Sequence, residues 1–107
     1  MSDTFDKIRL LARQRKVHVS QQGMAQLARR GIAIAEVAAG VAGGEAIEDC
    51  LDYHAGPAVL VLQKDALGRP LHVVWGIEKG TDERAVVVTA YRPDPTEWSA
   101  DFRSRKP

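Results

Sequence analysis

Cysteine, aromatic residues and long apolar runs are all scarce in this sequence. Its single cysteine, Cys50, excludes an intramolecular disulfide. No apolar run approaches the roughly 20 residues that cross a bilayer, so we expect no membrane-spanning segment. The amino-terminal segment is charged and lacks the apolar core of a signal peptide. Together these absences predict a cytoplasmic protein without membrane contact.

Two kinds of binding motif are also missing from the sequence. Neither a glycine-rich phosphate loop nor a dinucleotide-binding glycine pattern follows an expected strand. The candidates for metal ligation, Asp52, His54 and Asp65, lack the spacing of a ligand set. We therefore expect neither a cofactor nor a bound metal ion.

Length and charge set the remaining bounds. Residues 1–107, of which 45% are hydrophobic, are expected to form a single domain with one core. The net charge is only +1, but residues 1–32 hold seven Lys and Arg against two Asp, whereas residues 33–65 hold one Lys against six acidic residues. Such a partition can direct a polyanion to one side of the molecule, and it is equally compatible with solvated charges on helices.

Helical spacing of apolar residues dominates the first part of the chain. Phe5, Ile8 and Leu11 recur at helical spacing after a capping residue, Asp3 or Thr4. Serine before the second apolar series and glycine after it are typical helix boundaries. The expected elements are a basic N-terminal helix at 1–16, an extended link at 17–20, a second helix at 21–31 and a third, short helix at 34–41.

The second part of the chain changes to strand patterns. Four β-forming runs separated by turn residues are expected to be strands, at 46–53, 58–64, 71–77 and 86–91. Strands in meander order after helices predict an α+β fold in which two to three N-terminal helices pack on a four-stranded antiparallel sheet. The tail is expected to hold one loose helical turn around Trp98 and Phe102, and residues 99–107 to be frayed.

The strand at 71–77 presents a histidine on one face. Because side chains alternate along a strand, His72 points away from the bulky face that carries Leu71 and Trp75. We therefore expect its ring on the less buried side of the sheet. Tyr91 and Arg92 end the last strand just before a Pro-Asp-Pro turn, which predicts that both side chains lie at a rim.

Several short motifs in combination carry a family resemblance. They are Ser20, Arg29-Arg30-Gly31-Ile32, Glu36-Val37, Gly44-Glu45-x-Ile47-Glu48, Gly68-Arg69-Pro70-Leu71-His72-Val73-Val74, Thr89-Ala90-Tyr91-Arg92-Pro93-Asp94 and Trp98. With these motifs, the stretch from about Val17 to Trp98 resembles the domain-of-unknown-function family 4258.

That family is similar in outline to small toxins of the RelE and BrnT kind. The resemblance implies an RNA-directed toxin of a bacterial type II toxin–antitoxin system, a metal-independent endoribonuclease whose partner is a small zinc-ribbon or helix-turn-helix antitoxin. Many members have a histidine two residues after the motif serine or threonine, where this chain has Gln22. His18 lies on the near side of Ser20. If the family histidine is a general base, this departure favours a binding role.

Cleavage of RNA without a metal ion needs a group that accepts the 2′-hydroxyl proton, a donor for the leaving oxygen and cations for the phosphate. The catalytic candidates are His72, Tyr91 and Arg92, because imidazole titrates near neutrality, a phenol can donate a proton and a guanidinium matches phosphate oxygens. The candidates for binding RNA phosphates are Arg29, Arg30, Lys16 and Arg15, and the secondary candidates are His18 and Gln22.

Each main candidate also has a structural interpretation. His72 can be a bonded histidine within the fold, Arg30 can cap the last carbonyls of the second helix, and Tyr91 can cover the edge of the core. The alternative function is a non-catalytic protein-binding module, which would accept a partner peptide on the sheet face or edge.

Overall fold

The structure, a computed structural model, describes residues 2–50, 56–78 and 83–107. Asp52, His54 and the end of the strand expected at 46–53 lie outside the described residues. The elements in chain order are α1 (Asp3–Arg13), β1 (Val17–Val19), α2 (Gln21–Arg30), α3 (Ile34–Gly40), the 3-10 turn η1 (Val41–Gly43), β2 (Glu45–Cys50), β3 (Ala58–Lys64), β4 (Pro70–Glu78) and β5 (Arg84–Tyr91).

The helices begin and end at residues suited to those positions. In α1 the cap is Ser2 and not the expected Asp3 or Thr4, and its hydroxyl accepts a hydrogen bond from the Phe5 N–H. Ser20 caps α2 as predicted. The same helix ends at Gly31, whose φ of 66° lies in the left-handed region that glycine tolerates best.

The sheet has five strands in the order β1-β5-β4-β3-β2 and is mixed. The prediction of four antiparallel strands was therefore wrong by one strand. The expected link at 17–20 forms β1, which pairs in parallel with β5 through partners such as Val17 and Ala85. Three residues are too few to show a strand period in the sequence, so only the pairing with a distant strand reveals β1.

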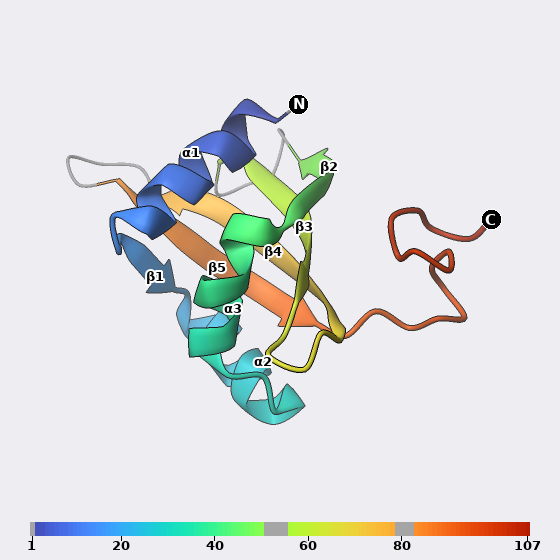
Figure 1. Cartoon of the computed structure of the whole chain (residues 1–107). Coiled ribbons are helices and arrows are strands. Elements are labelled where there is room, and N and C mark those ends of the chain that lie inside the picture. Colours follow the sequence, from blue (N-terminus) through green and yellow to red (C-terminus); the bar gives the residue numbers. More distant parts are fainter. Residues whose placement is uncertain (1, 51–55, 79–82) are drawn as a thin grey trace.

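The helices cover one face of the sheet. In Figure 1, α1 and α3 lie in front of the strands and α2 lies beside the lower end of β5. Apolar side chains from α1, α2, α3 and η1 meet those of β3, β4 and β5 in one buried cluster. Trp75 is fully buried there, and its Nε1 donates to Gln63 Oε1 at 2.7 Å. Gln63 Nε2 in turn donates to the Val37 carbonyl at 2.9 Å, so the buried amide has partners on both sides.

The opposite face, called the outer face below, carries His72, Leu62 and Tyr91. Cross-strand register places these three residues side by side, because Leu62 pairs with His72 and His72 pairs with Tyr91. Glu45 pairs with Leu62 and extends the same row to the edge strand β2. This row crosses the four consecutive strands from β2 to β5.

Residues 98–105, called the C-terminal strap below, fold back beside the sheet, away from the helical layer (Figure 1). A bridge between Trp98 and Arg105 closes the strap into a turn. Trp98 is only 3% exposed, and Arg105 pairs with Glu48 of β2 at 3.0 Å. The structure thus differs from the expected frayed tail, because the strap finds partners more than fifty residues away that no local pattern indicates.

Among the described residues, no helix combines the length and the apolar composition needed to cross a membrane.

Candidate functional site

His72 lies at the centre of the outer face and has 0% exposed surface. The ring lies on the face that alternation predicts, but it is not accessible there. Alternation along β4 does turn His72 away from Leu71 and Trp75, but the strap covers the face to which it turns. The ring lies nearly perpendicular to the Trp98 ring, with 4.3 Å between ring centroids.

Both ring nitrogens of His72 have hydrogen-bond partners. Nε2 lies 2.9 Å from the carbonyl oxygen of Phe102, and Nδ1 lies 3.2 Å from the hydroxyl of Tyr91. A carbonyl oxygen only accepts, so Nε2 carries the proton in the neutral ring. Nδ1 is then an acceptor, and the Tyr91 hydroxyl donates to it. Burial lowers the pKa of His72, which keeps the ring neutral at neutral pH.

Tyr91 connects this buried histidine with a polar cavity. The cavity has a volume of about 270 Å³ and is called the Tyr91 cavity below. Burial raises the pKa of Tyr91, so its hydroxyl keeps its proton in the resting protein. The residues that line the cavity are Gln22, Gln26, Arg30, Val88, Thr89 and Tyr91.

Arg30 extends from the end of α2 toward β5. Its Nη1 donates to the Ala90 carbonyl at 2.8 Å and to Thr89 Oγ1 at 3.2 Å. Thr89 Oγ1 donates in turn to Gln26 Oε1. The guanidinium therefore spans from helix to sheet and bonds a strand carbonyl, in place of the helix-capping role that its position before Gly31 also allowed.

Arg92 is directed to another part of the molecule. Its Nη1 lies 3.0 Å from Oδ2 of Asp65, in the turn between β3 and β4. Burial raises the pKa of Asp65, but hydrogen bonds from Arg69, Leu67 and Arg92 outweigh that effect and lower the pKa to about 2. The ring of His72 meets Tyr91, Trp98 and Phe102. Arg92 is thus a partner of the hairpin carboxylate, and the structure does not bring it to His72.

Of the other residues predicted from the sequence, one lines the Tyr91 cavity and four lie elsewhere. Gln22 lines the Tyr91 cavity. His18 lies on β1 and lines a different cavity of about 270 Å³ with Ser20. The remaining three, Arg15, Lys16 and Arg29, are exposed and are not among the residues that line the Tyr91 cavity.

Two polar cavity residues, Gln26 and Thr89, were not among the sequence candidates. A helical signal was available, because Gln22, Gln26 and Arg30 are spaced by four and therefore share one face of α2. Thr89 precedes Tyr91 by two residues on β5. The combination of these two faces depends on the packing of α2 against β5, which the sequence pattern alone does not specify.

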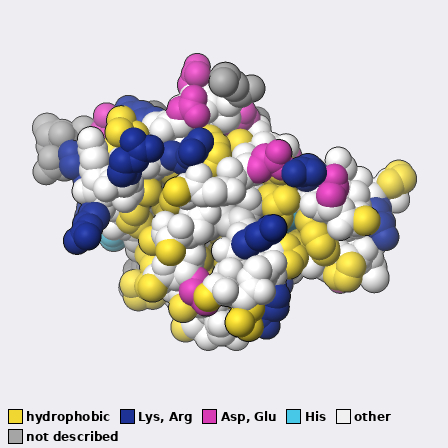
Figure 2. Space-filling model, viewed as in Figure 1, with side chains coloured by type: hydrophobic (Ala, Val, Ile, Leu, Met, Phe, Trp, Pro, Cys, Tyr) yellow, Lys and Arg dark blue, Asp and Glu magenta, His cyan; other side chains and the backbone are white. Residues whose placement is uncertain are grey.

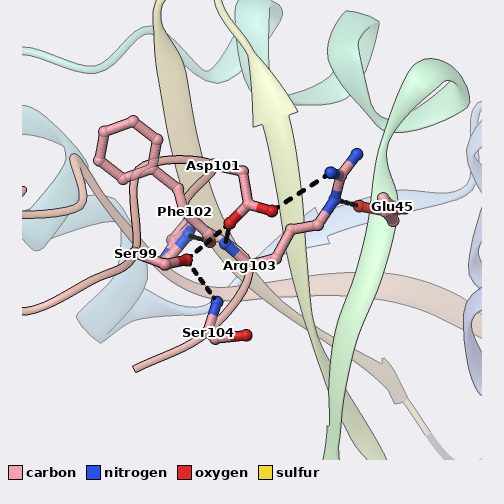
Figure 3. Close-up of polar contacts among 7 residues, drawn as sticks. Glu45, Ser99, Asp101, Phe102, Arg103 and Ser104 are labelled. Carbon is pink, nitrogen blue, oxygen red and sulfur yellow. Dashed lines mark hydrogen bonds and ion pairs between the residues drawn. The ribbon is translucent and has the colours of Figure 1, made fainter. Parts of the chain in front are cut away.

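A larger cavity of about 650 Å³ lies between the end of α3, the β3–β4 turn and the strap, and its lining includes Leu62, Phe102 and Arg103. Figure 3 shows that Arg103 extends between Asp101 and Glu45 and forms ion pairs with both. Its charge is therefore already balanced within the protein. Among the described residues, no group of three or more His, Cys, Asp or Glu side chains is arranged to hold a metal ion.

Comparison with known proteins gives one match. The model of the family described as "Domain of unknown function (DUF4258)" matches residues 19–92, which confirms the family resemblance seen in the sequence. No curated protein and no solved structure matches the chain. The matched range includes Gln22, Arg30, His72 and Tyr91, whereas α1 and the strap lie outside it.

Proposed function

The chain belongs to the DUF4258 family, and we propose that it is a toxin-like, RNA-directed protein that cleaves RNA without a metal ion. The single observation that carries this proposal is the arrangement of Arg30 and Tyr91 in one cavity, with His72 directly behind the tyrosine. A cation for phosphate and a hydroxyl backed by a base are two of the groups that such cleavage requires.

Tyr91 relays the proton in the proposed reaction. The Tyr91 oxygen accepts the proton of the RNA 2′-hydroxyl as its own proton passes to Nδ1 of His72, 3.2 Å away. The 2′-oxygen bonds to phosphorus, giving a 2′,3′-cyclic phosphate, and the leaving 5′-oxygen takes a proton from water. The imidazolium formed at His72 then returns its proton through Tyr91 to solvent, which restores the resting site.

Arg30 supplies the charge that the phosphate needs. Both of its described hydrogen bonds use Nη1, so Nε and Nη2 are the donors that can form a fork with two phosphate oxygens. The bonds to β5 hold the guanidinium in place and reduce the ordering that binding would cost. Gln22 adds an amide donor at the position of the family histidine, where it can orient the phosphate but cannot accept a proton.

Basic side chains outside the cavity support binding along the RNA backbone. Lys and Arg groups gather at the left and upper left of Figure 2, over α1. Arg15, Lys16 and Arg29 are exposed and add further positive charge. Contacts of this kind hold any RNA sequence and weaken as salt concentration rises.

The proposed partner is a small antitoxin of the zinc-ribbon or helix-turn-helix type. Met24 lies on α2 between Gln22 and Arg30 in sequence and is 60% exposed. An exposed apolar side chain on the helix that also carries Gln22 and Arg30 favours a partner that packs against α2. Such a partner would inhibit the protein by blocking access to Arg30.

A second candidate function is a non-catalytic module that binds a peptide by strand addition. It is favoured by the position of β2, which is an edge strand of the sheet. In this case the loss of Tyr91 or Arg30 would leave partner binding unchanged, because neither residue lies on β2.

Induced expression in a bacterial host tests the proposal, with growth and transcript integrity as the readouts. Tyr91→Phe keeps the ring and removes the proton relay, and Arg30→Ala removes the phosphate ligand. The matched control is Lys64→Ala, which removes one positive charge from an exposed position at the end of β3, outside the Tyr91 cavity. We expect growth arrest and cleaved transcripts with the native chain and with the control, and relief of both by the two cavity variants. Intact transcripts with the native chain would contradict the proposal and favour the binding module.

A further inference from the structure

The only backbone group bonded to the ring of His72 belongs to the strap, as far as the described residues extend. The Phe102 carbonyl accepts from Nε2 at 2.9 Å. Phe102 lies ten residues beyond the end of the family match at residue 92. The relay residues His72 and Tyr91 thus come from the family domain, and the group that orients the histidine comes from outside it.

The tautomer of His72 determines whether its Nδ1 can accept the hydroxyl proton of Tyr91. With the proton on Nε2, Nδ1 offers a lone pair to the Tyr91 hydroxyl. With the proton on Nδ1, the same nitrogen is a donor and cannot take the phenolic proton. An acceptor at Nε2 selects the first tautomer, in the way that a second group orients the catalytic histidine in hydrolytic triads.

We propose that the C-terminal strap contributes to the site. The Phe102 carbonyl is a positioning group: it keeps the proton of His72 on Nε2, so that Nδ1 can accept the proton of Tyr91. This inference rests on the function proposed above, because it concerns the same proton relay. It assigns to a segment outside the family domain a role that the family match does not include.

The strap is built to hold that carbonyl in one place. Asp101 Oδ1 accepts from Ser99 Oγ at 2.6 Å and from the Arg103 N–H at 3.1 Å, as Figure 3 shows. The Phe102 N–H donates to the Ser99 carbonyl at 2.9 Å. Phe102 has a φ of 61°, a left-handed conformation that a non-glycine residue adopts only where its surroundings enforce it.

Further contacts fasten this turn to the outer face. Trp98 packs edge-on against His72, and the Arg105 guanidinium lies over the Trp98 ring at 4.7 Å. Arg103 pairs with Glu45 and Arg105 pairs with Glu48, both on β2. Two charged groups act on His72: Arg105 lowers its pKa and Glu48 raises it. The uncharged groups against the ring are Tyr91, Trp98 and the Phe102 carbonyl.

Two substitutions of Phe102 distinguish the effect of its carbonyl position from the effect of its phenyl ring. Phe102→Gly removes the side chain but tolerates the positive φ. Phe102→Pro removes the side chain, fixes φ near about −65° and eliminates the N–H that donates to Ser99, so the turn cannot form. Nitrogen-15 NMR of the histidine ring reports both the tautomer and the pKa of His72 in the full chain.

We expect Phe102→Gly to keep the Nε2–H tautomer. We expect Phe102→Pro to show mixed tautomers and a His72 pKa that rises toward its ordinary value as the ring becomes exposed. RNA cleavage by Phe102→Pro should fall by about 10²-fold, as expected for loss of an acid–base group. If Phe102→Pro does not fold, Asp101→Ala is measured in the same way, because it removes two hydrogen bonds and one ion pair of the same turn.

An unchanged tautomer in Phe102→Pro, or equal effects of the glycine and proline substitutions, would overturn the inference. The two proposals can fail separately. If the tautomer depends on the strap but the native protein cleaves no RNA, the positioning role of Phe102 stands and the proposed reaction is wrong. If the native protein cleaves RNA and Phe102→Pro cleaves it equally well, the reaction stands and the positioning role is wrong.

Discussion

His72 and Tyr91 face each other across β4 and β5 and share a hydrogen bond of 3.2 Å on the outer face of the sheet. Their rings meet nearly edge-on, with 5.3 Å between centroids. The histidine is enclosed, whereas the tyrosine borders a polar cavity that also contains Arg30. This pair links a buried base to a place that a phosphodiester can reach, and four predictions follow from its setting.

The burial of His72 predicts a loss of stability in mild acid. Its folded-state pKa is lowered by burial below the ordinary value of 6.5, so the unfolded chain binds the proton first as the pH falls. The stabilising contribution is complete above about pH 6.5 and is lost as the pH falls toward the folded-state pKa. Urea unfolding at pH 7.5 and pH 5.5 measures the change. His72→Gln should reduce the pH dependence in this range, and an unaltered dependence would show that other groups cause it.

Gly23 allows α2 to approach β5 closely enough to form the Tyr91 cavity. A Cβ at this position would lie 2.8 Å from the Val88 carbonyl and 2.9 Å from the Val87 carbonyl. Because both contacts are backbone atoms, Gly23→Ala must move the helix, at a cost of about 1–3 kcal/mol in unfolding free energy. Gly43→Ala is the control, since a Cβ there meets nothing within 4 Å. Chemical denaturation of both variants checks the prediction, which equal stabilities would refute.

Arg92 is expected to contribute to the stability of the fold and not to RNA cleavage. Its partner Asp65 has a fully buried side chain, which also accepts from the backbone N–H groups of Leu67 and Arg69. Removal of one cation from a buried carboxylate costs about 1–3 kcal/mol. Arg92→Ala should therefore lower the midpoint of thermal unfolding while RNA cleavage, measured well below that midpoint, stays within about twofold of the native rate. Loss of cleavage in a folded Arg92→Ala protein would contradict this prediction and show that Arg92 contributes to the reaction.

Much of the fold could be predicted from local patterns. Capping by Ser20 and the break at Gly31 are local signals, and both α2 boundaries follow from them. Alternation along β4 indicates on which face His72 lies. Pattern analysis did not reveal β1, because three residues acquire their strand character only by pairing with β5.

The site depended more strongly on contacts between distant residues. The burial of His72 arises from Trp98 and Phe102, whose sequence neighbourhood is polar and predicts a frayed tail. Arg92 was a catalytic candidate together with His72 and Tyr91, yet it pairs with the hairpin carboxylate of Asp65 instead. Both differences come from a partner that is remote in sequence and that composition and spacing do not identify.

The central claim is that Tyr91 and Arg30 together cleave RNA without a metal ion. Its most direct test is incubation of the purified protein with a single-stranded RNA oligonucleotide in the presence of EDTA, with the ends of the products identified by mass spectrometry. The native protein is expected to give 2′,3′-cyclic phosphate ends, and Tyr91→Phe and Arg30→Ala are each expected to reduce the rate by about 10²- to 10⁴-fold. Absence of cleavage by the native protein, or a Tyr91→Phe protein that cleaves at the native rate, would contradict the claim.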